Sequence, residues 1–81
     1  MLIKNDFLLK GLGKRLQTLR LSKKLSQEEL ANMAEIPISQ VGRIERGEIN
    51  TTIVTLKALA DALEIDLVKL IDIKEENKKQ K

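Results

Sequence analysis

The side chains of this sequence best suited to molecular recognition lie in one short segment, residues 37–46. Ser39, Arg43 and Arg46 recur there at spacings of four and three, which places them on one face if the segment is helical. An arginine can bond both acceptors of a guanine edge, and a glutamine can pair in the same way with adenine. Arg43 and Gln40 supply these two groups. The segment therefore has the chemistry to read the edges of DNA bases.

The groups that enzymes use most are missing. The chain contains no cysteine and no histidine, which excludes disulfides, zinc sites of the usual kind, thiol nucleophiles and imidazole acid/base chemistry. We therefore expect neither a cofactor nor enzymatic activity. Residues 1–10 lack a continuous apolar stretch and a small-residue cleavage site, and no run of about 18 apolar residues occurs. These features predict a cytoplasmic protein that does not enter a membrane.

Length and composition predict one small helical domain. A chain of 81 residues has room for a single modest core. Its apolar residues, 42% of the total, are almost all Leu, Ile, Val and Ala, and the near absence of aromatic residues favours helices over a β-sandwich or barrel. The charged segment 74–81 has no hydrophobic stripe and accounts for most of the net charge of +3. We expect a domain over residues 1–73 and a disordered tail over residues 74–81.

Helical periodicity begins close to the N-terminus. Apolar residues spaced three and four apart predict a helix over residues 6–22, and they are Leu9, Leu12, Leu16 and Leu19. Ser26 and Glu29 have the spacing of a capping box, in which each side chain bonds the backbone N–H of the other residue. A second, short helix therefore begins there.

A proline separates the second helix from the third. Pro37 disfavours helical geometry in the residue before it and suits the first position of a new helix, which we predict over residues 37–46. Val41 and Ile44 lie on the core side of this third helix, opposite its polar and basic face. Gly47 can close it with a positive φ.

Two more helices complete an all-α fold of five helices. Thr51 and Thr52 offer an N-cap for the fourth helix, and Asp66 caps a short fifth helix. The apolar residues of both keep helical spacing, and they are Ile53, Leu56, Leu59, Ala60, Leu63, Leu67, Leu70 and Ile71.

Three segments carry motifs of a known kind. LSQEELA at residues 25–31 is followed by Ile36 and by RIERG at residues 43–47, and LKALADAL covers residues 56–63. Together they closely resemble the lambda-repressor/Cro type helix-turn-helix family, also called XRE-type, over roughly residues 13–70. The resemblance implies a five-helix domain that binds a pseudo-palindromic operator in double-stranded DNA as a dimer and regulates transcription. Restriction-modification controllers, antitoxins and phage-like repressors share this small size.

The resemblance also implies roles for single residues. Ser39, Gln40 and Arg43 match the positions that read base edges. Gln27, in the first turn of the second helix, matches a position that clamps a DNA phosphate beside the free N–H groups of the helix. Four residues at the far end of the third helix would hold the same backbone, namely Arg46, Asn50, Thr51 and Thr52. Thr52 has the alternative role of a helix cap.

Three more positions have roles implied by the family. Periodicity places Ile38 beside the core, whereas the matching family position approaches DNA, where Ile38 would touch a thymine methyl. Arg20 and Glu45 match positions that the family commonly joins in a partly buried ion pair between the first and third helices. We expect this pair to orient the third helix. Losing one partner would leave a costly charge behind.

The sequence departs from the family pattern at three positions. Glu35 stands where glycine is common, so the turn either avoids positive φ or tolerates a strain of about 1 kcal/mol. Gly42 lies inside the third helix at a cost of about 1 kcal/mol relative to alanine, where it either permits close approach of the DNA backbone or reflects drift. Glu64 stands where glycine often ends the fourth helix.

Two interaction surfaces follow from apolar residues near the ends of the chain. The first would join a homodimer through the fifth helix and the end of the fourth, and it comprises Ile65, Leu67, Val68, Leu70 and Ile71. The second belongs to an alternative function, an antitoxin-like protein-interaction module with secondary DNA binding. Its residues would dock on a partner or instead cover the core, and they are Leu2, Ile3, Phe7 and Leu8.

Overall fold

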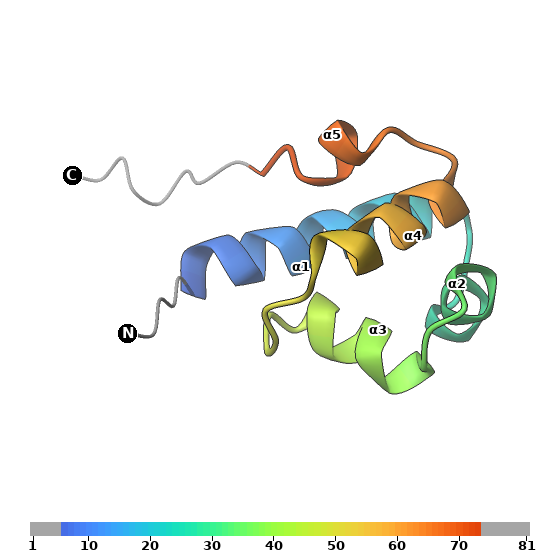
Figure 1. The fold of residues 1–81 in the computed structure, drawn as a ribbon, viewed down its shortest axis with the longest axis horizontal. Coiled ribbons are helices and arrows are strands. Elements are labelled where there is room, and N and C mark those ends of the chain that lie inside the picture. The colour runs from blue at the N-terminus through green and yellow to red at the C-terminus, as the bar shows by residue number, and fades with distance from the viewer. Residues whose placement is uncertain (1–5, 74–81) are drawn as a thin grey trace.

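The computed structural model describes residues 6–73, and in this part of the chain it contains five helices and no strand. In chain order they are α1 (Asp6–Ser22), α2 (Gln27–Ala34), α3 (Ile38–Glu45), α4 (Ile53–Leu63) and α5 (Leu67–Leu70) (Figure 1). The predicted all-α, five-helix fold is confirmed. The predicted tail at residues 74–81 lies outside the described residues, as do Leu2 and Ile3. None of the five helices is long and apolar enough to span a bilayer.

The five helices share one core. The long helix α1 lies between α3 on one side and α5 on the other, and α2 packs against both α3 and α4 (Figure 1). The largest fully buried side chains come from all five helices, and they are Leu16, Leu30, Val41, Ile44, Leu59, Leu63 and Leu70. Burial of these aliphatic groups is the main favourable contribution to folding.

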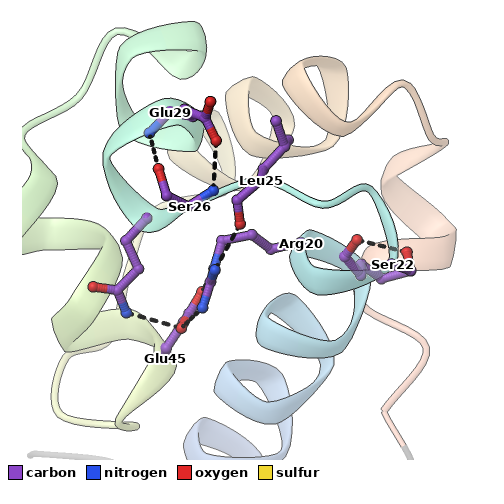
Figure 2. Close-up of polar contacts among 8 residues, drawn as sticks. Arg20, Ser22, Leu25, Ser26, Glu29 and Glu45 are labelled. Carbon is purple, nitrogen blue, oxygen red and sulfur yellow. Dashed lines mark hydrogen bonds and ion pairs between the residues drawn. The ribbon is translucent and has the colours of Figure 1, made fainter.

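The capping box at the start of α2 forms as predicted (Figure 2). The backbone N–H of Glu29 donates to Ser26 Oγ at 3.0 Å, and the backbone N–H of Ser26 donates to Glu29 Oε1 at 2.8 Å. These bonds satisfy N–H groups at the end of the helix that have no partner within it. They fix the residue at which α2 begins.

The third helix is one residue shorter at each end than predicted. Pro37 is the N-cap, with an extended ψ of 144°, and Arg46 is the C-cap. Because its ψ is extended, Pro37 stays outside the helix instead of occupying its first turn. Gly47 takes a φ of 73°, the left-handed conformation that the sequence predicts for it.

Among residues 6–73, three residues other than glycine also adopt left-handed backbone conformations. Glu35 and Glu64 are the C-caps of α2 and α4, with φ of 60° and 61°, and Lys24 has a φ of 62°. The turn at Glu35 therefore takes the strained alternative, at a cost of about 1 kcal/mol. The strain accompanies a compact helix end, in which the N–H of Ile36 donates to the carbonyl of Ala31 at 3.0 Å.

The last two helices begin in different ways. Thr52 Oγ1 accepts the backbone N–H of Thr55 at 3.1 Å and so caps α4. Asp66 is the N-cap residue of α5, but its side chain makes no capping hydrogen bond. Asp66 is thus the cap residue at the predicted position, and its backbone carbonyl accepts the N–H of Lys69 at 2.9 Å.

Helices α1 and α3 touch through their backbones at Gly13. A Cβ atom at this position would overlap the carbonyl oxygens of Ile44 and Glu45. Any larger residue would therefore push the helices apart. The contact holds the carboxyl end of α3 against α1 and helps to set the direction in which the outer face of α3 points.

Candidate nucleic-acid interface

The outer face of α3 is polar and open to solvent. Ser39 and Arg43 are exposed, and Arg46 extends the same exposed surface at the C-cap. On the opposite face Val41 and Ile44 are 0% and 1% exposed. Because one face is sealed into the core, the helix can turn only the other toward a ligand. That ligand would meet two guanidinium groups and a hydroxyl.

The two remaining candidates for base contacts differ in exposure. Ile38, the first residue of α3, is 49% exposed. It therefore lies outside the buried core, although helical periodicity places it at the core's edge. Gln40 is partly buried beside Val41. An apolar side chain and an amide thus flank the exposed polar face.

A carboxylate at the end of α3 joins three helices. Glu45 Oε2 accepts from Arg20 Nε at 2.7 Å, and Glu45 Oε1 accepts from Arg20 Nη2 at 3.1 Å and from Gln27 Nε2 at 3.0 Å. Arg20 Nη1 also donates to the carbonyl of Leu25 at 2.7 Å (Figure 2). The side chains of Arg20 and Glu45 are only 9% and 2% exposed.

The role of this cluster is to hold helices in position. Hydrogen bonding to Glu45 raises the pKa of Arg20 above its ordinary value, so the guanidinium stays charged. Each ion has a fixed partner at short range, as buried charges require. The cluster holds α3 against α1 and α2 and leaves the outer face of α3 uninvolved.

The contact made by Gln27 was missed by the sequence analysis. Its amide nitrogen donates to Glu45, and its Oε1 faces Gly42, about 3.5 Å from where a Cβ of residue 42 would lie. A Cβ at residue 42 would therefore be in ordinary van der Waals contact with the Gln27 amide. No short-range pattern could have revealed this contact, because the bonded residues are 18 positions apart.

The turn between α3 and α4 holds the remaining candidates for phosphate contacts. Asn50 is exposed. Thr51 is partly buried, and its Oγ1 is covered and has no hydrogen-bond partner in the structure. Thr52 Oγ1 donates to Thr55 Oγ1 at 3.0 Å in addition to accepting the N–H that caps α4. The capping alternative for Thr52 is thus what the structure contains.

A second ion pair lies in the same region. Arg46 Nε and Nη2 donate to Glu48 Oε2 and Oε1 at 2.8 and 3.2 Å. Hydrogen bonding to Arg46 lowers the pKa of Glu48, and the charges of Arg43 and Lys10 act in the same direction. The sequence analysis did not single out Glu48. The sequence feature that could have indicated Glu48 is a carboxylate two residues beyond an arginine, close to other basic side chains.

The apolar residues considered for a dimer interface divide into two groups. Leu70 is fully buried, and Ile65 and Leu67 are partly buried against the core. Val68 and Ile71 are 73% and 40% exposed. Val68 of α5 and Ile71, its C-cap residue, therefore remain available to a partner.

Comparison with known proteins relates the chain to DNA-binding regulators. Residues 16–70 match the family model described as Helix-turn-helix. The chain is 36% identical over 59 residues to the immunity repressor protein of Bacillus phage phi105, and the match covers 73% of this chain. It spans 41% of the length of that curated relative.

Two solved structures are similar in both sequence and fold. The restriction-modification controller protein C.AhdI from Aeromonas hydrophila is 44% identical with a TM-score of 0.76, over 76% of this chain and 94% of the controller. An HTH_3 family transcriptional regulator from Vibrio cholerae is 30% identical with a TM-score of 0.77, over 90% of this chain and 42% of the regulator. Both similarities extend over most of the described residues.

Proposed function

Because this chain belongs to the lambda-repressor/Cro (XRE) type helix-turn-helix family of DNA-binding transcriptional regulators, we propose that it regulates transcription by binding an operator as a homodimer. The operator is a pseudo-palindrome in double-stranded DNA, read by α3 in the major groove. The observation that carries this proposal is the division of α3, with Val41 and Ile44 buried and Ser39 and Arg43 exposed.

The base contacts follow from the chemistry of each side chain. Arg43 donates two hydrogen bonds to O6 and N7 of guanine, and Gln40 pairs with adenine. Ser39 bonds a neighbouring base edge. Ile38, which is 49% exposed, contacts a thymine methyl.

The phosphate contacts surround α3. Gln27 and the N-terminus of α2 hold one phosphate, with Gln27 using the second N–H of the amide nitrogen that donates to Glu45. Arg46 and Asn50 hold the backbone at the carboxyl end of α3. Thr51 and Thr52 are the weaker members of this group, because the hydroxyl of Thr51 is covered and that of Thr52 caps α4.

In this proposal the domain over residues 1–73 forms the homodimer, and its interface lies on α5 and the end of α4. Exposure of Val68 and Ile71 supports the α5 part of this surface. A two-fold dimer would present two α3 helices to successive major grooves, roughly 34 to 36 Å apart. Such a protein acts where the DNA is, which agrees with the cytoplasmic location expected from the sequence.

Selection of binding sites from random duplex DNA tests the proposal. We expect a recovered palindrome, and an affinity that falls steeply with added salt because phosphate neutralisation releases counterions. Recovery of no common site, with binding that ignores salt, would contradict it.

A second candidate is the antitoxin-like protein-interaction module. Phe7 is 58% exposed at the start of α1 instead of covering the core, which favours a docking role for that segment. Replacing Phe7 by serine discriminates the two functions. A DNA regulator would keep its operator affinity, whereas a module that holds a protein partner would lose the partner.

A further inference from the structure

The Arg46–Glu48 ion pair lies within the surface to which DNA binding is assigned. Arg46 is the C-cap of α3, and the backbone N–H of Glu48 donates to the carbonyl of Arg43 at 2.9 Å. That bond anchors Glu48 to the last turn of the helix. Its carboxylate then meets the guanidinium of Arg46 through two parallel hydrogen bonds.

The charges of three cations from two parts of the fold act on this carboxylate. Arg43 and Arg46 belong to α3 and its cap, and Lys10 comes from α1. The backbone brings Lys10 close, since a Cβ at Gly47 would lie 3.0 Å from the Lys10 Cα. Glu48 therefore sits where basic groups converge, an environment that also suits a phosphate.

We propose that Glu48 competes with DNA for Arg46, holding the guanidinium in the free protein and releasing it when a backbone phosphate binds. This inference rests on the proposed function and adds a regulatory contact to the same site. Because the competition concerns a phosphate and not a base, it lowers the affinity for every duplex by a similar factor.

When Arg46 leaves the Glu48 carboxylate for a phosphate, one pair of hydrogen bonds replaces another, and the exchange is easily reversed. A guanidinium presents the same two-donor fork to a carboxylate and to a phosphate. The side chains of Arg46 and Glu48 are 58% and 50% exposed, so water screens their attraction and the pair opens readily. A competing pair of this strength lowers affinity by about two- to fivefold.

The first test is Glu48→Gln, with affinity measured on a mixed-sequence duplex and on the selected operator. We expect about a two- to fivefold gain on both. The salt dependence of binding should steepen by up to about one phosphate contact. A matched control is Asp61→Asn in α4, which breaks the exposed Lys57–Asp61 pair with the same change in net charge. The control should leave affinity nearly unchanged, and an equal gain in both variants would overturn the proposal.

A double-mutant cycle separates competition for Arg46 from simple repulsion of DNA by Glu48. If Glu48 acts through Arg46, the gain from Glu48→Gln disappears when Arg46 is already glutamine. If Glu48 only repels phosphate, the gain persists, and the proposal is wrong.

The free protein provides a readout that does not depend on DNA. An NMR titration should find the carboxyl pKa of Glu48 below its usual value, and Arg46→Gln should raise it. Unchanged titration in that variant would contradict the pairing itself.

Salt-dependent DNA binding together with a failed cycle refutes only the role of Glu48. Failure to bind any duplex refutes the proposed function, and the competition with it.

Discussion

Glu45 accepts hydrogen bonds from two helices other than its own. Its carboxylate bonds Arg20 of α1 and Gln27 of α2 while its backbone lies in α3. One buried group thus positions the helix that carries Ser39 and Arg43. Residues that fix α3 and residues that α3 presents to a ligand are different sets, which makes their effects separable by mutation.

Glu45→Gln should lower the free energy of unfolding by about 3 kcal/mol, because it leaves the guanidinium of Arg20 buried without a counter-charge. Urea denaturation measures this change. Asp61→Asn is the matched control, since its pair with Lys57 is more than half exposed and should cost less than about 1 kcal/mol. Equal losses in the two variants would show that burial of the Arg20–Glu45 pair carries no energetic weight.

Arg43→Ala should weaken binding to the selected operator by about 1 to 3 kcal/mol and relax the preference at one base pair. Its side chain is exposed and outside the core, so stability should be unaffected. Fluorescence anisotropy with operator and scrambled duplexes measures both effects. Lys57→Ala in α4 serves as a control for loss of one positive charge. If Arg43→Ala bound both duplexes as the parent does, Arg43 would have no part in reading bases.

At the scale of the helices, two glycines have opposite meanings. Gly13 lies at a backbone contact between α1 and α3, whereas a Cβ at Gly42 would meet only the ends of flexible side chains, 3.0 Å from Arg46 Nη1 and 3.5 Å from Gln27 Oε1. Backbone carbonyls cannot move without moving a helix. Side-chain ends can.

Gly13→Ala should therefore lower the free energy of unfolding by about 2 kcal/mol through overpacking. Gly42→Ala should raise it by up to about 1 kcal/mol, because alanine is the better helix former. Thermal and urea unfolding of the two variants make a direct comparison. The same sign of change at both positions would contradict the assigned contacts.

At the scale of the whole molecule, the proposed operator binding requires two copies. Within residues 6–73 the core is complete without a partner, since all five helices bury apolar side chains in it. The proposed association would therefore use side chains left outside the core, among which Val68 of α5 is 73% exposed.

Val68→Glu should shift the protein to monomers in sedimentation equilibrium without lowering its stability. Affinity for the full palindrome should fall, while affinity for a half-site is retained. Leu21→Glu, at the end of α1 and 57% exposed, places the same charge on another apolar surface as a control. Dimers that survived Val68→Glu and failed with Leu21→Glu would move the interface away from α5.

Much of the fold could be predicted because its determinants are local. The limits of α1, the capping box of Ser26 and Glu29 and the positive φ of Gly47 each depend on residues within a few positions of one another. At Glu35 the sequence left two alternatives open, a turn that avoids positive φ and a turn that tolerates strain. The structure has the strained one, with a φ of 60° at Glu35 and the N–H of Ile36 bonded to the carbonyl of Ala31.

The sequence by itself determined the order of the helices and the side chains of α3 that cannot enter the core, since helical period and end signals act over one or two turns. Tertiary structure alone decided that Gln27 bonds Glu45, that Gly13 touches α3 and that Lys10 lies against Gly47. These contacts join residues far apart in the chain, and their distances depend on how the helices cross. Periodicity specifies which face of a helix is buried, but not which residue of another helix lies opposite it.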